Sequence, residues 1–152
     1  MRNLKLIILL LFLSSCGYSS IYKNQKSLDF QLNIVGTEGD YEMNNLISNE
    51  IKLNSNKDSQ NIYDINIDTD YKKDILTKNS SGVITDYNLS VVSVFSINLK
   101  NKNKTFKFEE NINIKSQSDI FEQNTYEKNI KRNFASSIRE KLMSAILVAN
   151  DN

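Results

Sequence analysis

Three consecutive runs of alternating residues constrain the fold of this chain more than any other feature. A period of two over at least five residues is typical of a β-strand with one buried side. The side expected to be buried comprises Tyr63, Ile65, Ile67, Thr69 and Tyr71 in the first run; Thr85, Tyr87, Leu89, Val91, Ser93, Phe95, Ile97 and Leu99 in the second; and Phe106, Phe108, Ile112 and Ile114 in the third. Short polar turns at residues 79–82 and 101–103 join the runs, which favours an antiparallel meander.

The other sides of the first two runs differ in character. Aspartates alternate with the inward residues of the first run at Asp64, Asp68 and Asp70, and we interpret them as the solvated face of a strand. The middle of the second run also carries Val92 and Val94, which predicts that both sides of that middle are covered.

A strand and a helix are expected before the meander. Leu28, Phe30, Leu32 and Ile34 alternate with polar residues and predict a strand that ends at Gly36, followed by a turn over residues 36–39. Residues 40–53 then show apolar positions at helical spacing, with Asp40 as the N-cap. One residue conflicts with this helix, because Glu50 falls inside its apolar arc.

The last element is a long helix that runs to Ala149 without a glycine. Asp119 with Glu122 is one candidate start, and Asn124 or Thr125 a turn later is another. The apolar face comprises Phe134, Ile138, Leu142, Ala145 and Ala149, flanked by Ala135 and Ile146. The predicted fold is therefore α+β: a two-layer sandwich of order βαβββα, with a mixed or antiparallel four-stranded sheet and both helices on one face.

The first residues of the chain predict export. Arg2 and Lys5 precede an apolar run at residues 6–13, and the run ends at small residues. This pattern is typical of a secretory leader, and the run is far shorter than the ~20 residues of a membrane-spanning helix. We expect residues 1–15 to be a lipoprotein signal peptide, residues 16–27 a lipidated tether and residues 28–150 one folded domain.

The residues around the cleavage point specify the kind of export. Leu13, Ser14, Ser15 and Cys16 resemble the bacterial lipobox, and Cys16 is the only cysteine in the chain. The resemblance implies a diacylglyceryl group on the Cys16 sulfur and a further acyl chain on its freed amine, which together anchor a protein stably. The two following residues, Gly17 and Tyr18, lack the Asp of inner-membrane retention signals, so we expect the periplasmic side of the outer membrane.

Composition argues against several classes of function. The chain has no histidine and a formal charge of +1, and the leader takes two basic residues with it. The commonest general base and the usual transition-metal ligands are therefore absent, and nucleic-acid binding is not expected. Paired acids such as Glu109 and Glu110 lack the partners of an acid–base or calcium site. We expect neither an enzyme, nor a metal site, nor a cofactor apart from the covalent lipid.

One group of basic residues is a candidate binding feature. Lys100, Lys102, Lys104 and Lys107 cluster at the turn between the second and third runs. Two interpretations are open. The lysines are either solvated turn residues that discourage pairing of the sheet edge with another strand, or residues that contact the phosphates of an anionic glycolipid.

The start of the mature chain resembles a known family. Residues 16–22, Cys-Gly-Tyr-Ser-Ser-Ile-Tyr, are similar to the start of the lipopolysaccharide (LPS)-assembly lipoproteins of the LptE family, particularly the alphaproteobacterial members, although Ser20 replaces their usual Pro. The expected order of elements and the run at residues 138–142 are also similar to that family.

The resemblance implies a partner. Members of the family plug the large outer-membrane β-barrel of the LPS translocon, an LptD-like protein, assist its folding and are implicated in binding LPS. The alternatives are an accessory lipoprotein of another lipid-transport system and a lipidated periplasmic hydrolase, and the missing catalytic residues argue against the hydrolase.

Overall fold

The computed structural model describes residues 30–56, 59–99 and 102–150. The elements follow the predicted order βαβββα. They are β1 (Gln31–Gly39), α2 (Tyr41–Leu53), β2 (Ile62–Lys78), β3 (Ile84–Leu99), β4 (Lys102–Lys115) and α3 (Ile120–Asn150). Cys16 and Lys100 lie outside the described residues.

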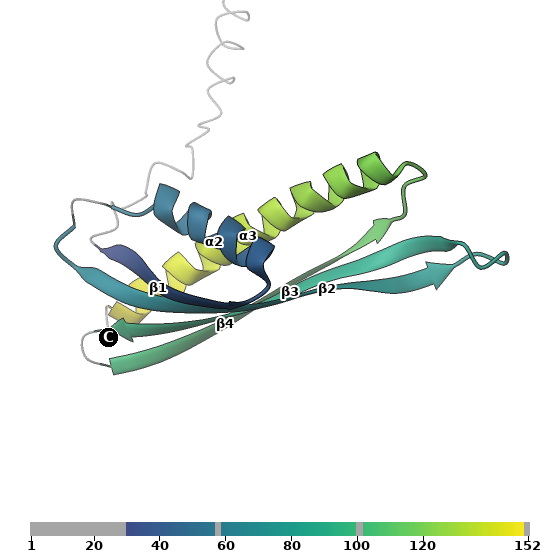
Figure 1. The fold of residues 1–152 in the computed structure, drawn as a ribbon. Coiled ribbons are helices and arrows are strands. Elements are labelled where there is room, and N and C mark those ends of the chain that lie inside the picture. The colour runs from purple at the N-terminus through teal and green to yellow at the C-terminus, as the bar shows by residue number, and fades with distance from the viewer. Residues whose placement is uncertain (1–29, 57–58, 100–101, 151–152) are drawn as a thin grey trace, which may run out of the picture.

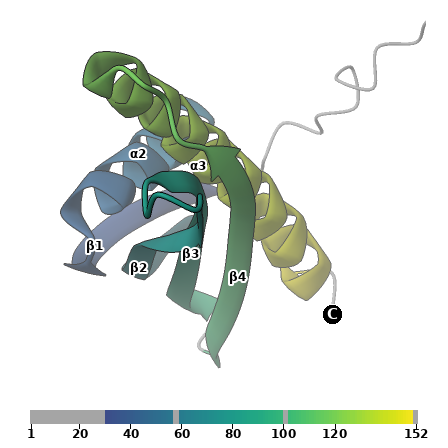
Figure 2. The same cartoon turned by 90° about the vertical axis from the view of Figure 1, so that its right-hand side faces the viewer.

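The four strands form one mixed sheet in the order β1-β2-β3-β4. The meander is antiparallel as predicted. In contrast, β1 pairs in parallel with β2, because α2 carries the chain back to the end of the sheet where β1 begins. Both helices lie on the same face of the sheet (Figures 1 and 2). The predicted two-layer α+β sandwich is therefore confirmed.

The first strand continues past the position where the sequence predicts a turn. It runs to Gly39 because a bulge between Ile34 and Gly36 restores its pairing with β2. A Cβ atom at Gly36 would lie 2.6 Å from the side-chain oxygen of Asn66, so a larger residue here would require the Asn66 side chain to move. The chain leaves the strand only at Gly39, where φ is +83°.

The two helices begin at caps that the sequence indicates. The Asp40 carboxylate accepts a hydrogen bond from the Met43 amide at 2.8 Å. In α3 the earlier candidate start is correct, because Asp119 accepts from the amides of Phe121 and Glu122 at 2.8 and 2.9 Å. The conflict at Glu50 is also resolved, since this carboxylate faces Arg139 of α3 across the helix pair at 3.9 Å.

The core lies between the sheet and the helices. It includes the predicted inward residues of β2 and β3 and the apolar face of α3, with Ile47, Ile65, Leu89, Ile138 and Leu142 all at 0% exposure. Burial of such side chains is the main source of stability in a domain without a disulfide framework.

Within the described ranges, no helix or strand packs on the opposite face of the sheet, so the prediction that both sides of the β3 middle are covered is wrong. Val92 and Val94 have the parity of this open face, pairing with Asp70 and Asp68 of β2, and are half-buried. Their sheet neighbours explain the partial burial: Val94 lies between Asp68 and Lys107 in the register, and long side chains shield apolar surface with their stems.

The sandwich has two unlike ends (Figure 1). At the entry end the chain enters the fold at Phe30, and this end also holds the C-termini of α2 and α3 and the start of β4. At the hairpin end the β2–β3 hairpin and the start of α3 extend beyond α2.

Candidate functional site

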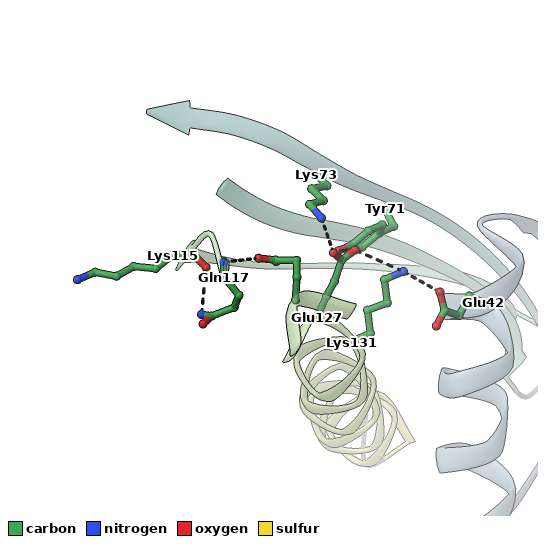
Figure 3. A network of polar contacts seen from close by, with 8 residues as sticks. Glu42, Tyr71, Lys73, Lys115, Gln117, Glu127 and Lys131 are labelled. Carbon is green, nitrogen blue, oxygen red and sulfur yellow. Dashed lines mark hydrogen bonds and ion pairs between the residues drawn. The ribbon is translucent and has the colours of Figure 1, made fainter. Parts of the chain in front are cut away.

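A network of charged side chains ties both helices to β2 (Figure 3). Glu127 of α3 accepts hydrogen bonds from the Tyr71 hydroxyl at 2.9 Å and from Lys73 Nζ at 2.7 Å. Lys131, one turn along α3, binds Glu42 of α2 at 2.7 Å and stands 4.3 Å from the centre of the Tyr71 ring. Three elements that are distant in sequence therefore share one set of ion pairs.

The ionisation of this network follows from its surroundings. Burial opposes the charge on Glu127, but the hydrogen bonds from Lys73 and Tyr71 and the charge of Lys131 outweigh it and hold the pKa of Glu127 below its usual value. Burial, together with the adjacent Glu127 carboxylate, raises the pKa of the Tyr71 hydroxyl. Tyr71 therefore remains a proton donor and Glu127 a charged acceptor across the physiological range.

These shifts favour a structural role. General acid–base catalysis works best with groups whose pKa lies near the operating pH, and both pKa values move away from neutrality.

The hollow beside the network has a volume of about 250 Å³ and is lined by Glu42, Asn124, Glu127, Lys128 and Lys131. Among residues 30–56, 59–99 and 102–150, no group of three or more acids arranged to hold a metal is present.

The sequence contains a signal for part of this network. Glu127 and Lys131 stand four residues apart on α3, a spacing that brings opposite charges together on a helix, and their charged atoms lie 3.9 Å apart. The contributions of Tyr71 and Glu42 depend on how the helices dock, and no local pattern in the sequence indicates them.

The paired acids at residues 109–110 face opposite sides of β4. Glu109 is exposed, whereas Glu110 faces α3, where it binds Lys141 at 2.8 Å and accepts from the Ser137 hydroxyl. Burial opposes the charge on Glu110, but Lys141 and Ser137 lower its pKa overall. Glu109 is therefore a solvent-exposed surface residue, whereas Glu110 forms a structural ion pair with Lys141.

The aspartates of β2 lie where the sequence predicts a wet face. Asp64, Asp68 and Asp70 are all exposed on the open face of the sheet. Asp64 accepts from the Asn33 amide at 2.7 Å, and Asp70 pairs with Lys72 at 2.8 Å. Their interpretation as a solvated strand face is confirmed.

The candidate lysines do not share one surface. Lys102 is exposed at the entry end, and Lys104 turns toward α3, where Nζ donates to the backbone oxygen of Ala149 at 3.2 Å. That contact places a positive charge at the carboxyl end of a helix whose last turn has no basic residue of its own. Lys107 is exposed on the opposite face of β4.

Exposed apolar side chains gather at the hairpin end. Ile75, Leu76 and Val83 lie on the β2–β3 hairpin, and Ile120 and Phe121 begin α3. Each is at least half exposed, and Ile120 and Phe121 are 78% and 75% exposed.

In the part of the chain that the structure describes, neither helix combines the length and apolar character needed to cross a membrane.

No family model matches this sequence, and no curated protein matches it. The fold, in contrast, is similar to that of solved bacterial proteins. Rare lipoprotein B from Shewanella oneidensis superposes with a TM-score of 0.60 at 15% identity, over 79% of this chain and 98% of that one. A candidate lipoprotein from Caulobacter crescentus gives 0.54 at 10% identity, over 80% and 92%. A minor lipoprotein from Acinetobacter baumannii gives 0.50 at 11% identity, over 78% and 94%.

Because these sequence identities are low, the structural similarity establishes a shared fold alone. It covers nearly the whole of each solved chain. The sandwich seen here is thus an architecture that bacterial proteins described as lipoproteins also adopt.

Proposed function

We propose that this chain is a lipoprotein of the outer membrane that plugs the β-barrel of the LPS translocon and assists LPS insertion at the cell surface. The observation that carries the proposal is the βαβββα sandwich, which matches the fold of rare lipoprotein B over 98% of that chain. The lipobox ending at Cys16 and the resemblance of residues 16–22 to the LptE family add independent support.

The hairpin end is the surface we assign to the barrel. Its exposed apolar side chains come from two elements, and clusters of this kind mark contacts with other macromolecules. Some large outer-membrane barrels are plugged, and a rigid sandwich held by a lipid at its other end suits the role of a plug.

The function is not expected to include catalysis. The chain has no histidine, and its sole cysteine is the proposed lipid attachment site. Screening the mature protein against ester and peptide substrates tests this expectation, and turnover of either would revive the hydrolase alternative.

Copurification tests the partner. Extraction of membranes in mild detergent, followed by capture of this chain, should recover a large outer-membrane barrel. Recovery of the chain alone, with the barrel present in the lysate, would contradict the proposal. Recovery of inner-membrane or periplasmic transport components instead would favour the alternative, an accessory subunit of another lipid-transport system.

A matched pair of variants localises the contact. Val83→Gln combined with Phe121→Gln removes two exposed apolar side chains at the hairpin end and should reduce barrel recovery several-fold. Val35→Gln, at a 54% exposed position on β1 toward the entry end, should leave recovery unchanged. Equal recovery from both variants would remove the hairpin end from the interface.

Direct contact between LPS phosphates and Lys100, Lys102, Lys104 and Lys107 is a separate part of the proposal. Neutralising all four should weaken LPS binding in vitro, and unchanged affinity would end this idea. Because Lys104 binds Ala149 and Lys107 faces the other side of β4, neutralisation of Lys102 should have the largest individual effect among the three described lysines.

A further inference from the structure

The two edges of the sheet are unequally protected. A strand at a sheet edge presents unpaired backbone groups, and charged side chains discourage other strands from pairing with them. On β4 such charges lie on both sides, with Lys104 and Glu110 toward α3 and Lys107 on the open face. The nine residues of β1 include a single charged side chain, Glu38. The β1 edge is therefore the less protected of the two.

The backbone of β1 offers hydrogen-bonding groups along this edge. The amides of Gln31 and Asp40, at the two ends of the strand, donate to backbone oxygens on or next to β2. Backbone groups alternate in direction along a strand, and the bulge in the middle of β1 adds one residue. The amides of Leu32, Ile34 and Thr37 therefore point away from β2, to a side on which no described strand pairs.

One flank of α2 borders the same edge. Glu42 and Glu50 face α3, where they contact Lys131 and Arg139. Helical spacing places Tyr41 and Ser48 on the opposite flank, and Figure 2 shows α2 over β1 with α3 on its other side. Tyr41 is 81% exposed. A strand added beside β1 would therefore meet both a backbone edge and the flank of a helix.

An unneutralised pair of acids lies on the open side of this edge. Glu38 of β1 and Asp68 of β2 are opposite each other in the register, and both are exposed. Among the described residues neither carboxylate forms an ion pair. Like charges directly opposite each other on a sheet are destabilising. A basic side chain placed beside Glu38 by an added strand relieves that repulsion, so charge complementarity favours a basic segment.

We propose that β1 accepts an extended, basic segment of the barrel partner as a fifth strand of the sheet. This strand addition rests on the proposed function for the identity of the partner, and it assigns that partner a second contact. A barrel surrounds its plug, so a contact along β1 is compatible with one at the hairpin end.

Strand addition also has a clear division of labour. Main-chain hydrogen bonds supply the affinity, and alternate side chains supply the specificity. The bulge in β1 adds selectivity, because an incoming strand has to match an irregular edge.

A matched pair of proline variants tests the backbone contact. Thr37→Pro removes an outward amide from β1. Thr105→Pro removes one from β4, where the amide of Ser116 donates toward β3 and sets the alternation. After extraction of membranes in mild detergent, the Thr37→Pro chain should recover several-fold less barrel than the wild type, and the Thr105→Pro chain should recover as much. Urea unfolding of both variants checks that they remain folded.

Charge reversal tests the basic segment without altering the backbone. Glu38→Lys should reduce barrel recovery several-fold, whereas Glu109→Lys, at an exposed position on the open side of β4, should leave it unchanged. Val35→Gln retains every backbone amide of β1, so its expected recovery is that of the wild type.

Hydrogen exchange locates the added strand directly. Amides of residues 31–39 should exchange several-fold more slowly in the wild-type complex than in the isolated lipoprotein, while those of residues 102–115 should exchange at the same rate in both. This measurement needs no substitution, so it decides the question even where a proline variant is unfolded.

The outcomes separate this contact from the proposed function. Barrel recovery that Thr37→Pro and Glu38→Lys leave unchanged overturns the strand addition while the plug stands, as does unchanged exchange in β1. Equal losses from Thr37→Pro and Thr105→Pro also overturn it. A wild-type chain that recovers no barrel overturns both proposals.

Discussion

Replacing Glu127 by Gln tests whether the charged network fastens the helices to the sheet. Only 14% of the Glu127 side chain is exposed, and it accepts from Tyr71 and Lys73 while Lys131 stands 3.9 Å away. The amide has nearly the same shape and still offers an oxygen acceptor. The substitution therefore removes the charge and leaves the packing largely intact.

The expected loss follows from the contacts. Hydrogen bonds to a charged group contribute about 1.5–3 kcal/mol each, and those to a neutral acceptor about 1 kcal/mol. Lys73 is 31% exposed, so its share is reduced by solvent screening, and Lys131 keeps Glu42 as a partner. We expect Glu127→Gln to lower the free energy of unfolding by about 1–2 kcal/mol, a fall in Tm of about 3–8 °C for a domain of this size.

The pH dependence gives an independent check. The pKa of Glu127 is lowered in the folded state. The stability that its charged form gives the fold is therefore complete above the unfolded-state pKa of about 4.3, and it is lost as the pH falls through the lower folded-state pKa. Urea unfolding followed by circular dichroism at neutral pH and near pH 3 should therefore show a gap between wild type and variant that narrows on acidification.

The control is Glu109→Gln, which makes the same charge change at an exposed position of β4. It should shift the unfolding midpoint by less than about 0.5 kcal/mol. Equal effects of the two substitutions, or a gap for Glu127→Gln that does not change with pH, would refute the structural role of the network.

Three further substitutions test the fold. Ile138→Ala, at a position with 0% exposure, should cost about 2–5 kcal/mol in urea unfolding, and a smaller loss would contradict the packing of α3 on the sheet. Gly39→Ala places a Cβ atom 2.1 Å from the Thr69 backbone oxygen at φ +83°, so it should cost more than Gly82→Ala, where φ is +81° with open space around it. Asp40→Ala should lower stability by about 1 kcal/mol in thermal unfolding, and Asp40→Asn, which retains the cap, should restore most of it.

The sequence was sufficient to predict the elements because each has a strong local pattern. The period-two runs predict β2, β3 and β4, and the N-caps at Asp40 and Asp119 predict the helix starts. The extension of β1 to Gly39 was missed because two nearby glycines are the usual signal for a turn. Only the pairing with β2 shows that Gly36 lies inside the strand, against the Asn66 side chain. The chain turns at the second glycine, Gly39.

The functional surfaces were less predictable, because they depend on which side chains the register brings together. A cluster of lysines in sequence implies one patch, but residues of opposite parity on a strand face opposite sides, as Lys104 and Lys107 do. The contact of Tyr71 with Glu127 joins a strand to a helix that begins after two further strands, and no local pattern carries that information.

The two ends of the sandwich follow from its topology. A βαβ unit opens the domain, so the C-terminus of α2 returns to the end where β1 begins, and the meander then brings α3 back to finish at the same end. In this fold the point where the chain enters at Phe30, the end of α2 and the end of α3 therefore lie at one end of the sandwich. The proposed anchor at Cys16 therefore joins the fold at the end opposite the hairpin end, which is the surface we assign to the barrel.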